Sequence, residues 1–224
     1  MTRPFVMLLV SLFSGLAIAQ TTPTTAPAPP GKLGEPVQLF NGKDLTGWAW
    51  FSPQNVPLEQ LWTVKDGLLH CAAGPSGYIH TEKEYENYVL TVEERHVNRG
   101  NGGILFAMSG PDKLWPKSLE IQGQSGGEGH MRGVADFKLN QDPARVGNRQ
   151  LNRIGPDSAK PMGQWDTIVI TVDHQTVWAT VNGVLQNYVT ANESLKGKIG
   201  LQSEGGEMEF RRIEIRPTLD GGKN

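Results

Sequence analysis

The chain has 224 residues, which suits one β-sandwich domain with short additional segments. Its formal net charge is −2, and it contains neither a basic run nor a glycine-rich phosphate loop that leads into a helix. Because phosphate backbones are bound by clustered cations, we expect no nucleic-acid partner.

The first residues, 1–19, have the pattern of a secretory signal peptide. Arg3 supplies a positive charge, 5–18 is apolar but short for a membrane span, and Ala17-Ile18-Ala19 fits a signal-peptidase site. We therefore expect a secreted or periplasmic protein with no membrane insertion after signal cleavage. An uncleaved N-terminal anchor is the alternative.

The Thr-, Pro- and Ala-rich segment 20–36 cannot bury a core and is expected to be an extended linker. A folded domain is predicted over 37–216, followed by a polar C-terminal tail over 217–224. Cys71 is the only cysteine, which excludes an internal disulfide. The domain must then be stabilised by an apolar core, and we expect Cys71 to be a small buried member of it.

Short apolar or β-branched runs separated by tight turns predict an all-β domain. Asp66-Gly67 and Asn182-Gly183 are hairpin-turn dipeptides, and each lies between two such runs. The run 88–97 alternates, so Glu93 and Arg95 share one strand face. The segment 123–162 is irregular and rich in Gly, Asn, Arg and Pro, which is typical of a functional or mobile region.

A polar strand face is predicted at the end of the segment 101–122. In 118–122, Ser118, Glu120 and Gln122 point to one side of a strand, and the intervening leucine and isoleucine point to the other. This polar face is either an ordinary solvated surface or the floor of a cleft that binds a ligand rich in hydroxyl groups.

Several short motifs follow one another along 37–216. They are LFNGKDLTGW at 39–48, WTVKDGLL at 62–69, NGGILF at 101–106, EIQ at 120–122, VNG at 181–183, GKIGLQSEG at 197–205 and FRRIEI at 210–215. In this order they resemble the 3-keto-disaccharide hydrolase family. The resemblance implies a concanavalin A-like jelly-roll β-sandwich of two antiparallel sheets, one of them concave, and substrates that are sugars oxidised at C3.

The chain departs from the pattern of this family beside the expected cleft. Ala107 stands where the family usually has an arginine, and the segment 123–126 lacks the usual aspartate. These departures favour the alternative of a jelly-roll module that binds carbohydrate without chemistry, because one fold serves many functions.

Cleavage of a 3-keto glycoside would proceed by proton transfer. The ketone acidifies the C2 hydrogen, so a base can remove it, the aglycone can leave from C1, and addition of water completes a net hydrolysis. Such an exported glycoside hydrolase or lyase needs a base, a donor or cation at the developing oxyanion, and an acid for the leaving group. An ordinary endo-glucanase ranks last, because it needs two carboxylates across a cleft and Glu93 and Glu94 point to opposite faces.

Glu120 is the first candidate for acid–base work. We expect Glu93 and Arg95 to meet it across neighbouring strands, while His130 is a candidate base from the irregular segment. Lys138 or Arg132 could stabilise an enolate. The expected catalytic residues are Glu120, Glu93 and His130, and the expected substrate-binding residues are Arg95, Gln122, Asn101, Trp115 and Lys138.

Each candidate also has a purely structural interpretation, such as a solvated strand carboxylate, a surface ion pair or an exposed histidine. The spacings typical of zinc and calcium ligands are absent, so the sequence predicts no metal ligand and no cofactor. The expected partner is an oligosaccharide or an oxidised sugar, and the oligomeric state is left open.

Overall fold

The computed structural model describes residues 28–219. The predicted signal peptide, the first part of the predicted linker and the last five residues lie outside this range. No helix in the described part of the chain has the length and apolar character that a membrane span requires.

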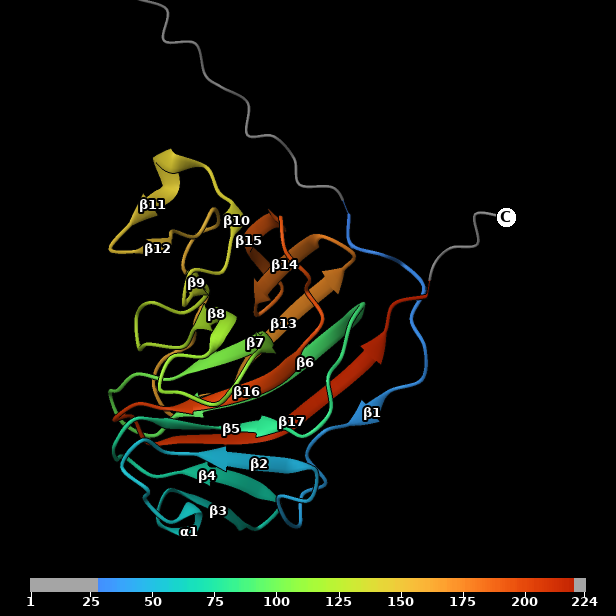
Figure 1. The fold of residues 1–224 in the computed structure, drawn as a ribbon. Coiled ribbons are helices and arrows are strands. Elements are labelled where there is room, and N and C mark those ends of the chain that lie inside the picture. Colours follow the sequence, from blue (N-terminus) through green and yellow to red (C-terminus); the bar gives the residue numbers. More distant parts are fainter. Residues whose placement is uncertain (1–27, 220–224) are drawn as a thin grey trace, which may run out of the picture.

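Two antiparallel sheets face each other, which confirms the predicted jelly-roll sandwich (Figure 1). The nine-stranded sheet has the order β10-β15-β14-β13-β6-β17-β4-β3, with β1 beside β17. Its strands are β1 (Val37–Gln38), β3 (Trp62–Lys65), β4 (Leu68–Cys71), β6 (Tyr88–His96), β10 (Leu139–Asn140), β13 (Asp166–Asp173), β14 (Thr176–Val181), β15 (Val184–Ala191) and β17 (Met208–Pro217).

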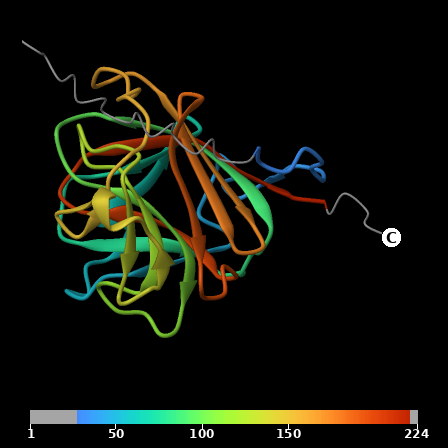
Figure 2. The same ribbon diagram turned by 90° about the horizontal axis from the view of Figure 1, so that it is seen from above.

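The eight-stranded sheet has the order β11-β12-β9-β8-β7-β16-β5-β2. Its strands are β2 (Trp48–Phe51), β5 (Gly77–Thr81), β7 (Gly103–Ser109), β8 (Lys117–Gln122), β9 (Met131–Val134), β11 (Val146–Gly147), β12 (Gln150–Leu151) and β16 (Lys198–Ser203). Two single turns of helix, α1 (Leu58–Leu61) and the 3₁₀ turn η1 (Pro143–Arg145), complete the described elements. Seen from above, the yellow-green strands of this sheet lie apart from the orange strands of the other (Figure 2).

The predicted hairpin turns are present where the sequence placed them. Asp66 and Gly67 join β3 to β4 with φ angles of +53° and +77°, and Asn182 and Gly183 join β14 to β15 with +49° and +81°. Two successive left-handed residues match the twist of a two-residue hairpin, which is why Asp-Gly and Asn-Gly are favoured there. Pairing also continues slightly beyond 37–216, because Leu33 bridges Thr218.

The apolar core lies between the inner faces of the two sheets. Leu90 and Val92 of β6 are fully buried, as are Ile104 of β7 and Leu119 of β8. Each such side chain contributes about 1.5–3 kcal/mol through removal of apolar surface from water. Cys71 is 1% exposed and belongs to this core, as predicted, and burial raises the pKa of its thiol to about 12.

Candidate functional site

The outer face of the eight-stranded sheet carries the polar strand face predicted at 118–122. Leu119 points into the core, so Glu120 points outward by strand alternation. In the register of the sheet, Glu120 lies between Leu105 of β7 and Arg132 of β9. The fold therefore sets a carboxyl beside a guanidinium on neighbouring strands.

A loop between β7 and β8 covers part of this outer face. The Tyr78 hydroxyl donates to Asp112 Oδ1 at 3.1 Å, and His80 Nε2 lies 3.3 Å from the same oxygen. Beneath the loop, Tyr78, Leu105 and Met108 form a small apolar cluster. The anchored loop leaves Trp115 at the edge of the part of the sheet that stays uncovered.

The uncovered part is a hollow of about 630 Å³, a size that suits small-molecule ligands. Its lining combines acids, cations and one aromatic ring, and Trp115 is 39% exposed there. The lining residues are Trp115, Glu120, Arg132, Gly133, Val134, Ala135, Asp136, Arg149 and Glu204. This mixture can grip hydroxyl groups while an aromatic ring contacts the apolar face of a sugar.

Glu120 is the most perturbed acid of the hollow. Its side chain is 1% exposed, and burial raises the pKa of the carboxyl to about 7, with Arg132 opposing the shift and Glu204 adding to it. A carboxyl with a pKa close to neutral gives up and takes back a proton readily, which is what acid–base catalysis requires.

Glu204 brings a second carboxyl to the hollow. Burial raises its pKa as well, and the charge of Arg132 again works against the shift. Asn101 Nδ2 donates to Glu204 Oε2 at 2.5 Å and fixes the orientation of the carboxyl. Two acids in different surroundings near one cation can divide the roles of proton acceptor and proton donor.

The predicted residues on and around β8 have distinct positions. Glu120 and Trp115 line the hollow, and Asn101 holds Glu204. Gln122 Oε1 accepts a hydrogen bond from the Gln124 backbone N–H at 3.0 Å, so its amide helps to fix the following loop.

His130 lies at the end of the β8–β9 pairing, where its carbonyl accepts from the backbone of Gln122. Burial lowers the pKa of its imidazole, and Arg153 lowers it further. His130 is absent from the lining of the hollow, and Lys138 is as well: Lys138 is exposed and its backbone N–H donates to Glu193.

The expectation that Glu93 and Arg95 meet Glu120 is wrong. Both lie on β6 of the nine-stranded sheet, whose inner face carries Leu90 and Val92, so their side chains point outward on the opposite layer. Glu93 accepts from Arg211 Nε at 2.5 Å, and Arg95 pairs with Glu209 and stacks on Trp165 at 4.7 Å. The physical reason is that alternation predicts which side chains share one face of a strand, but it does not predict to which of the two sheets the strand belongs.

Ala107 also lies elsewhere than the expected cleft. It sits at an irregularity of the β7–β8 pairing with a φ of +50°, is 1% exposed, and belongs to the core between the sheets. Its departure from the family pattern therefore alters the interior of this protein and leaves the lining of the hollow unaffected.

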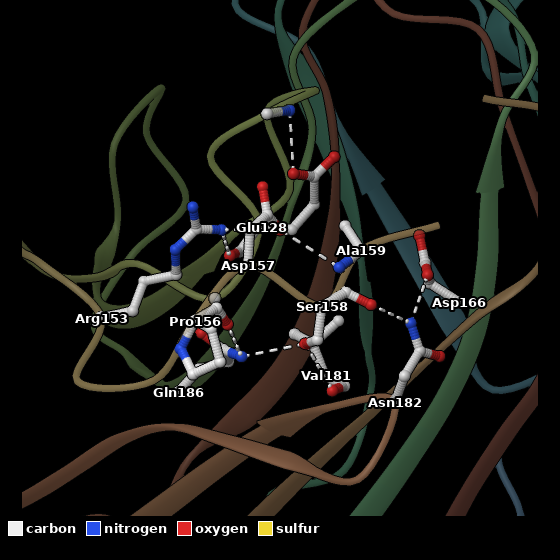
Figure 3. Close-up of polar contacts among 12 residues, drawn as sticks. Glu128, Arg153, Pro156, Asp157, Ser158, Ala159, Asp166, Val181, Asn182 and Gln186 are labelled. Carbon is white, nitrogen blue, oxygen red and sulfur yellow. Dashed lines mark hydrogen bonds and ion pairs between the residues drawn. The ribbon is translucent and has the colours of Figure 1, made fainter. Parts of the chain in front are cut away.

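The later part of the irregular segment is hydrogen-bonded to residues of the nine-stranded sheet and its β14–β15 turn (Figure 3). Gln186 Nε2 donates to the Pro156 carbonyl and to Ser158 Oγ, each at 2.9 Å. Asn182 Nδ2 donates to the Ser158 carbonyl and to Asp166 Oδ1. These bonds attach the irregular segment to the nine-stranded sheet. An earlier part of the same segment supplies Arg132 and Arg149 to the hollow.

Sequence reasoning missed Glu204 as a site residue. The available signal was the alternation of Gly200, Gln202 and Glu204 within the motif 197–205, which sets the last two on one strand face. In the described residues 28–219, no group of three or more His, Cys, Asp or Glu side chains is arranged to hold a metal ion.

The fold is that of a jelly-roll domain, and its family and a curated relative place it among carbohydrate-active, hydrolase-like domains. The chain belongs to the family described as the 3-keto-alpha-glucoside-1,2-lyase-like domain, whose model matches residues 35–216. A 3-keto-disaccharide hydrolase of Bacteroides thetaiotaomicron is 24% identical in an alignment 228 positions long, which spans 80% of this chain and 77% of that protein.

Two solved structures show how widely the fold is used. The β-glucanase of Bacillus licheniformis matches 84% of this chain and 99% of its own, with a TM-score of 0.57 and 14% identity. A carbohydrate-binding module, CBM66 of Bacillus subtilis, matches 75% of this chain and 94% of its own, with a TM-score of 0.53 and 8% identity. Because an enzyme and a binding module share this sandwich, the function must be argued from the hollow.

Proposed function

We propose that the hollow binds a glycoside whose sugar is oxidised at C3 and cleaves it by proton transfer at C2. The observation that carries the proposal is the Glu120 carboxyl, with its pKa near 7, between Arg132 and a second acid, Glu204. The printed descriptions of the family and of the Bacteroides relative support the oxidised sugar as the substrate class.

In this proposal Glu120 is the base. It takes the proton from C2, and the electron pair of the C–H bond moves into the C2–C3 bond of an enolate. Arg132 faces the enolate oxygen as its negative charge develops. The electron pair then forms the C1–C2 double bond as the C1–O bond breaks.

Glu204 supplies the proton for the departing oxygen in this proposal, because it brings the second carboxyl to the hollow. The product is an unsaturated keto sugar, and addition of water across C1 and C2 gives the net hydrolysis. Trp115, at the rim, provides an aromatic surface for the sugar ring. We also propose export, on the signal-peptide pattern of residues 1–19.

The test is incubation of the purified protein with 3-keto-trehalose and with 3-keto-glucosides, with release of 3-keto-glucose or an unsaturated keto sugar as the readout. The proposal predicts release by the wild type and none by Glu120→Gln. Glu93→Gln is the matched control, because it removes an acid of the same type from the opposite layer. Binding of these sugars without release would make the domain a carbohydrate-binding module instead.

A further inference from the structure

Gln202 is a buried amide that the fold does not use. Its side chain is 3% exposed, and neither Nε2 nor Oε1 has a hydrogen-bond partner among the described residues. A buried polar group without a partner costs the folded state free energy, so such groups usually serve a ligand or a water molecule.

The missing side chain at Gly103 leaves room for this amide. A Cβ built on Gly103 would collide with Gln202 Oε1 and would lie 3.1 Å from Glu120 Oε1. The amide of Gln202 and the carboxyl of Glu120 therefore lie together above Gly103, one from β16 and the other from β8.

Trp115 and Glu204 connect the surroundings of Gln202 to the hollow. Both residues line the hollow that contains Glu120, and both also border a tight crevice beside it that contains Gln202. Gln202 thus lies buried at the side of the hollow, next to the proposed base, and its amide has to turn toward the hollow to meet a ligand.

We infer that Gln202 is the residue that recognises the oxidised carbon of the sugar, by pairing its amide with the C3 ketone and the hydroxyl beside it. A primary amide presents one donor and one acceptor on the same edge. A ketone oxygen can only accept and the adjacent hydroxyl can donate, so the two pairs are complementary. With C3 held at Gln202, the neighbouring C2 lies on the side of Glu120, where the proton is removed.

This inference rests on the proposed function and predicts which sugar loses more when the amide is removed. A ketone obtains its hydrogen bond from the Gln202 N–H. The C3 hydroxyl of an unoxidised glucoside can instead donate to the side-chain oxygen at position 120, which is a carboxyl oxygen in the wild type and an amide oxygen in Glu120→Gln. Removal of the amide should therefore weaken binding of the keto sugar more than binding of the parent sugar.

The experiment measures calorimetric affinities of methyl 3-keto-glucoside and methyl glucoside in a Glu120→Gln background, which prevents turnover. Adding Gln202→Met should weaken binding of the keto sugar roughly 5- to 30-fold and reduce its preference over the parent sugar. The melting temperature should stay the same or rise, because an unpartnered buried amide is replaced by an apolar side chain.

Gln186→Met is the matched control. Gln186 is also fully buried, but its Nε2 donates to Pro156 and Ser158, so this variant should melt at a lower temperature and keep the keto preference (Figure 3). Gly103→Ala gives a second test, because its added Cβ would displace the Gln202 amide without removing it, and it should also weaken binding of the keto sugar.

The inference is overturned if Gln202→Met keeps the keto preference, or if it melts as early as Gln186→Met. Cleavage of keto sugars by a Gln202→Met protein with unchanged preference would remove this inference and leave the proposed function intact. Failure of the wild-type protein to bind or cleave any keto sugar would instead remove the proposed function, and this inference with it.

Discussion

The two outer faces of the sandwich carry similar residue types in opposite states. On the nine-stranded sheet, Glu93 and Glu209 are paired with arginines, and Arg95 and Arg211 stack on Trp165. On the eight-stranded sheet, Glu120 is buried and its pKa is close to neutral. A carboxylate that is paired with an arginine stays ionised near neutral pH. A carboxyl that is buried away from water has a raised pKa, so it can exchange a proton near neutral pH.

The first prediction contrasts the acids on the two faces. Glu120→Gln should lower the rate of keto-sugar cleavage by about 10²–10⁴-fold, the range expected for loss of a positioned acid–base group. Glu93→Gln should leave that rate unchanged, because its side chain faces away from the hollow on the other layer. Steady-state kinetics on one keto glucoside compares the two variants. Equal losses of cleavage rate would contradict the assignment of catalysis to the outer face of the eight-stranded sheet.

A buried acid outside the hollow separates burial from catalysis. Glu94 is 3% exposed, lies opposite Asp166 across β6 and β13, and has a pKa raised to about 8 by burial, with Asp166 and Glu128 adding to the shift. The folded state retains this proton above the ordinary carboxyl range, whereas the unfolded state releases it. The contribution of Glu94 therefore makes the fold less stable as the pH rises from about 5 to 9.

Glu94→Gln should remove that loss, which is roughly 2–4 kcal/mol of the free energy of unfolding at pH 9. Denaturant unfolding at pH 6 and pH 9 measures it, with cleavage activity at pH 7 followed in parallel. The same pH dependence in the variant as in the wild type would show that Glu94 is not held in its protonated form.

Arg132 offers a smaller and more selective change within the hollow. If Glu120 acts as a base, activity rises with pH through about 7, and the charge of Arg132 holds that pKa down. Arg132→Met should lower the rate and move the rising limb of the kcat/KM profile upward by about one pH unit. A rising limb that stays near pH 7 in Arg132→Met would show that the group titrating in the kcat/KM profile is not Glu120.

The smallest effect is expected on the paired face. Arg95→Met removes an ion pair with Glu209, a largely buried acid that keeps its contact with His70, and a stacking contact with Trp165. We expect a loss of about 1–2 kcal/mol in the free energy of unfolding and no change in keto-sugar cleavage. Thermal unfolding and a single-substrate assay are sufficient, and a large loss of activity would give this face a role beyond stability.

Much of the fold followed from local patterns. Asp66-Gly67 and Asn182-Gly183 identify their hairpins because few other residues adopt two left-handed conformations in succession. Alternation at 118–122 likewise gave the outward direction of Glu120. Both features depend on neighbouring residues alone, so a single sequence is sufficient to predict them.

The partners of Glu120 were harder to predict because they depend on which strands become neighbours. Arg132 and Glu204 reach the hollow from strands β9 and β16 or their ends, while Glu93 belongs to the other sheet despite the same alternation. The unpartnered amide of Gln202 and its position above Gly103 can be recognised only from side-chain positions in three dimensions. Such tertiary features have no local signature in the sequence.

The most direct measurement is the fate of the C2 hydrogen when a 3-keto glucoside is cleaved in D₂O. Removal of that proton by Glu120, followed by addition of solvent, predicts one deuterium at C2 of the released keto sugar, seen by NMR and mass spectrometry. Glu120→Gln should give neither release nor exchange above the background without protein. Wild-type release of a keto sugar that retains its original C2 hydrogen would contradict proton abstraction at C2.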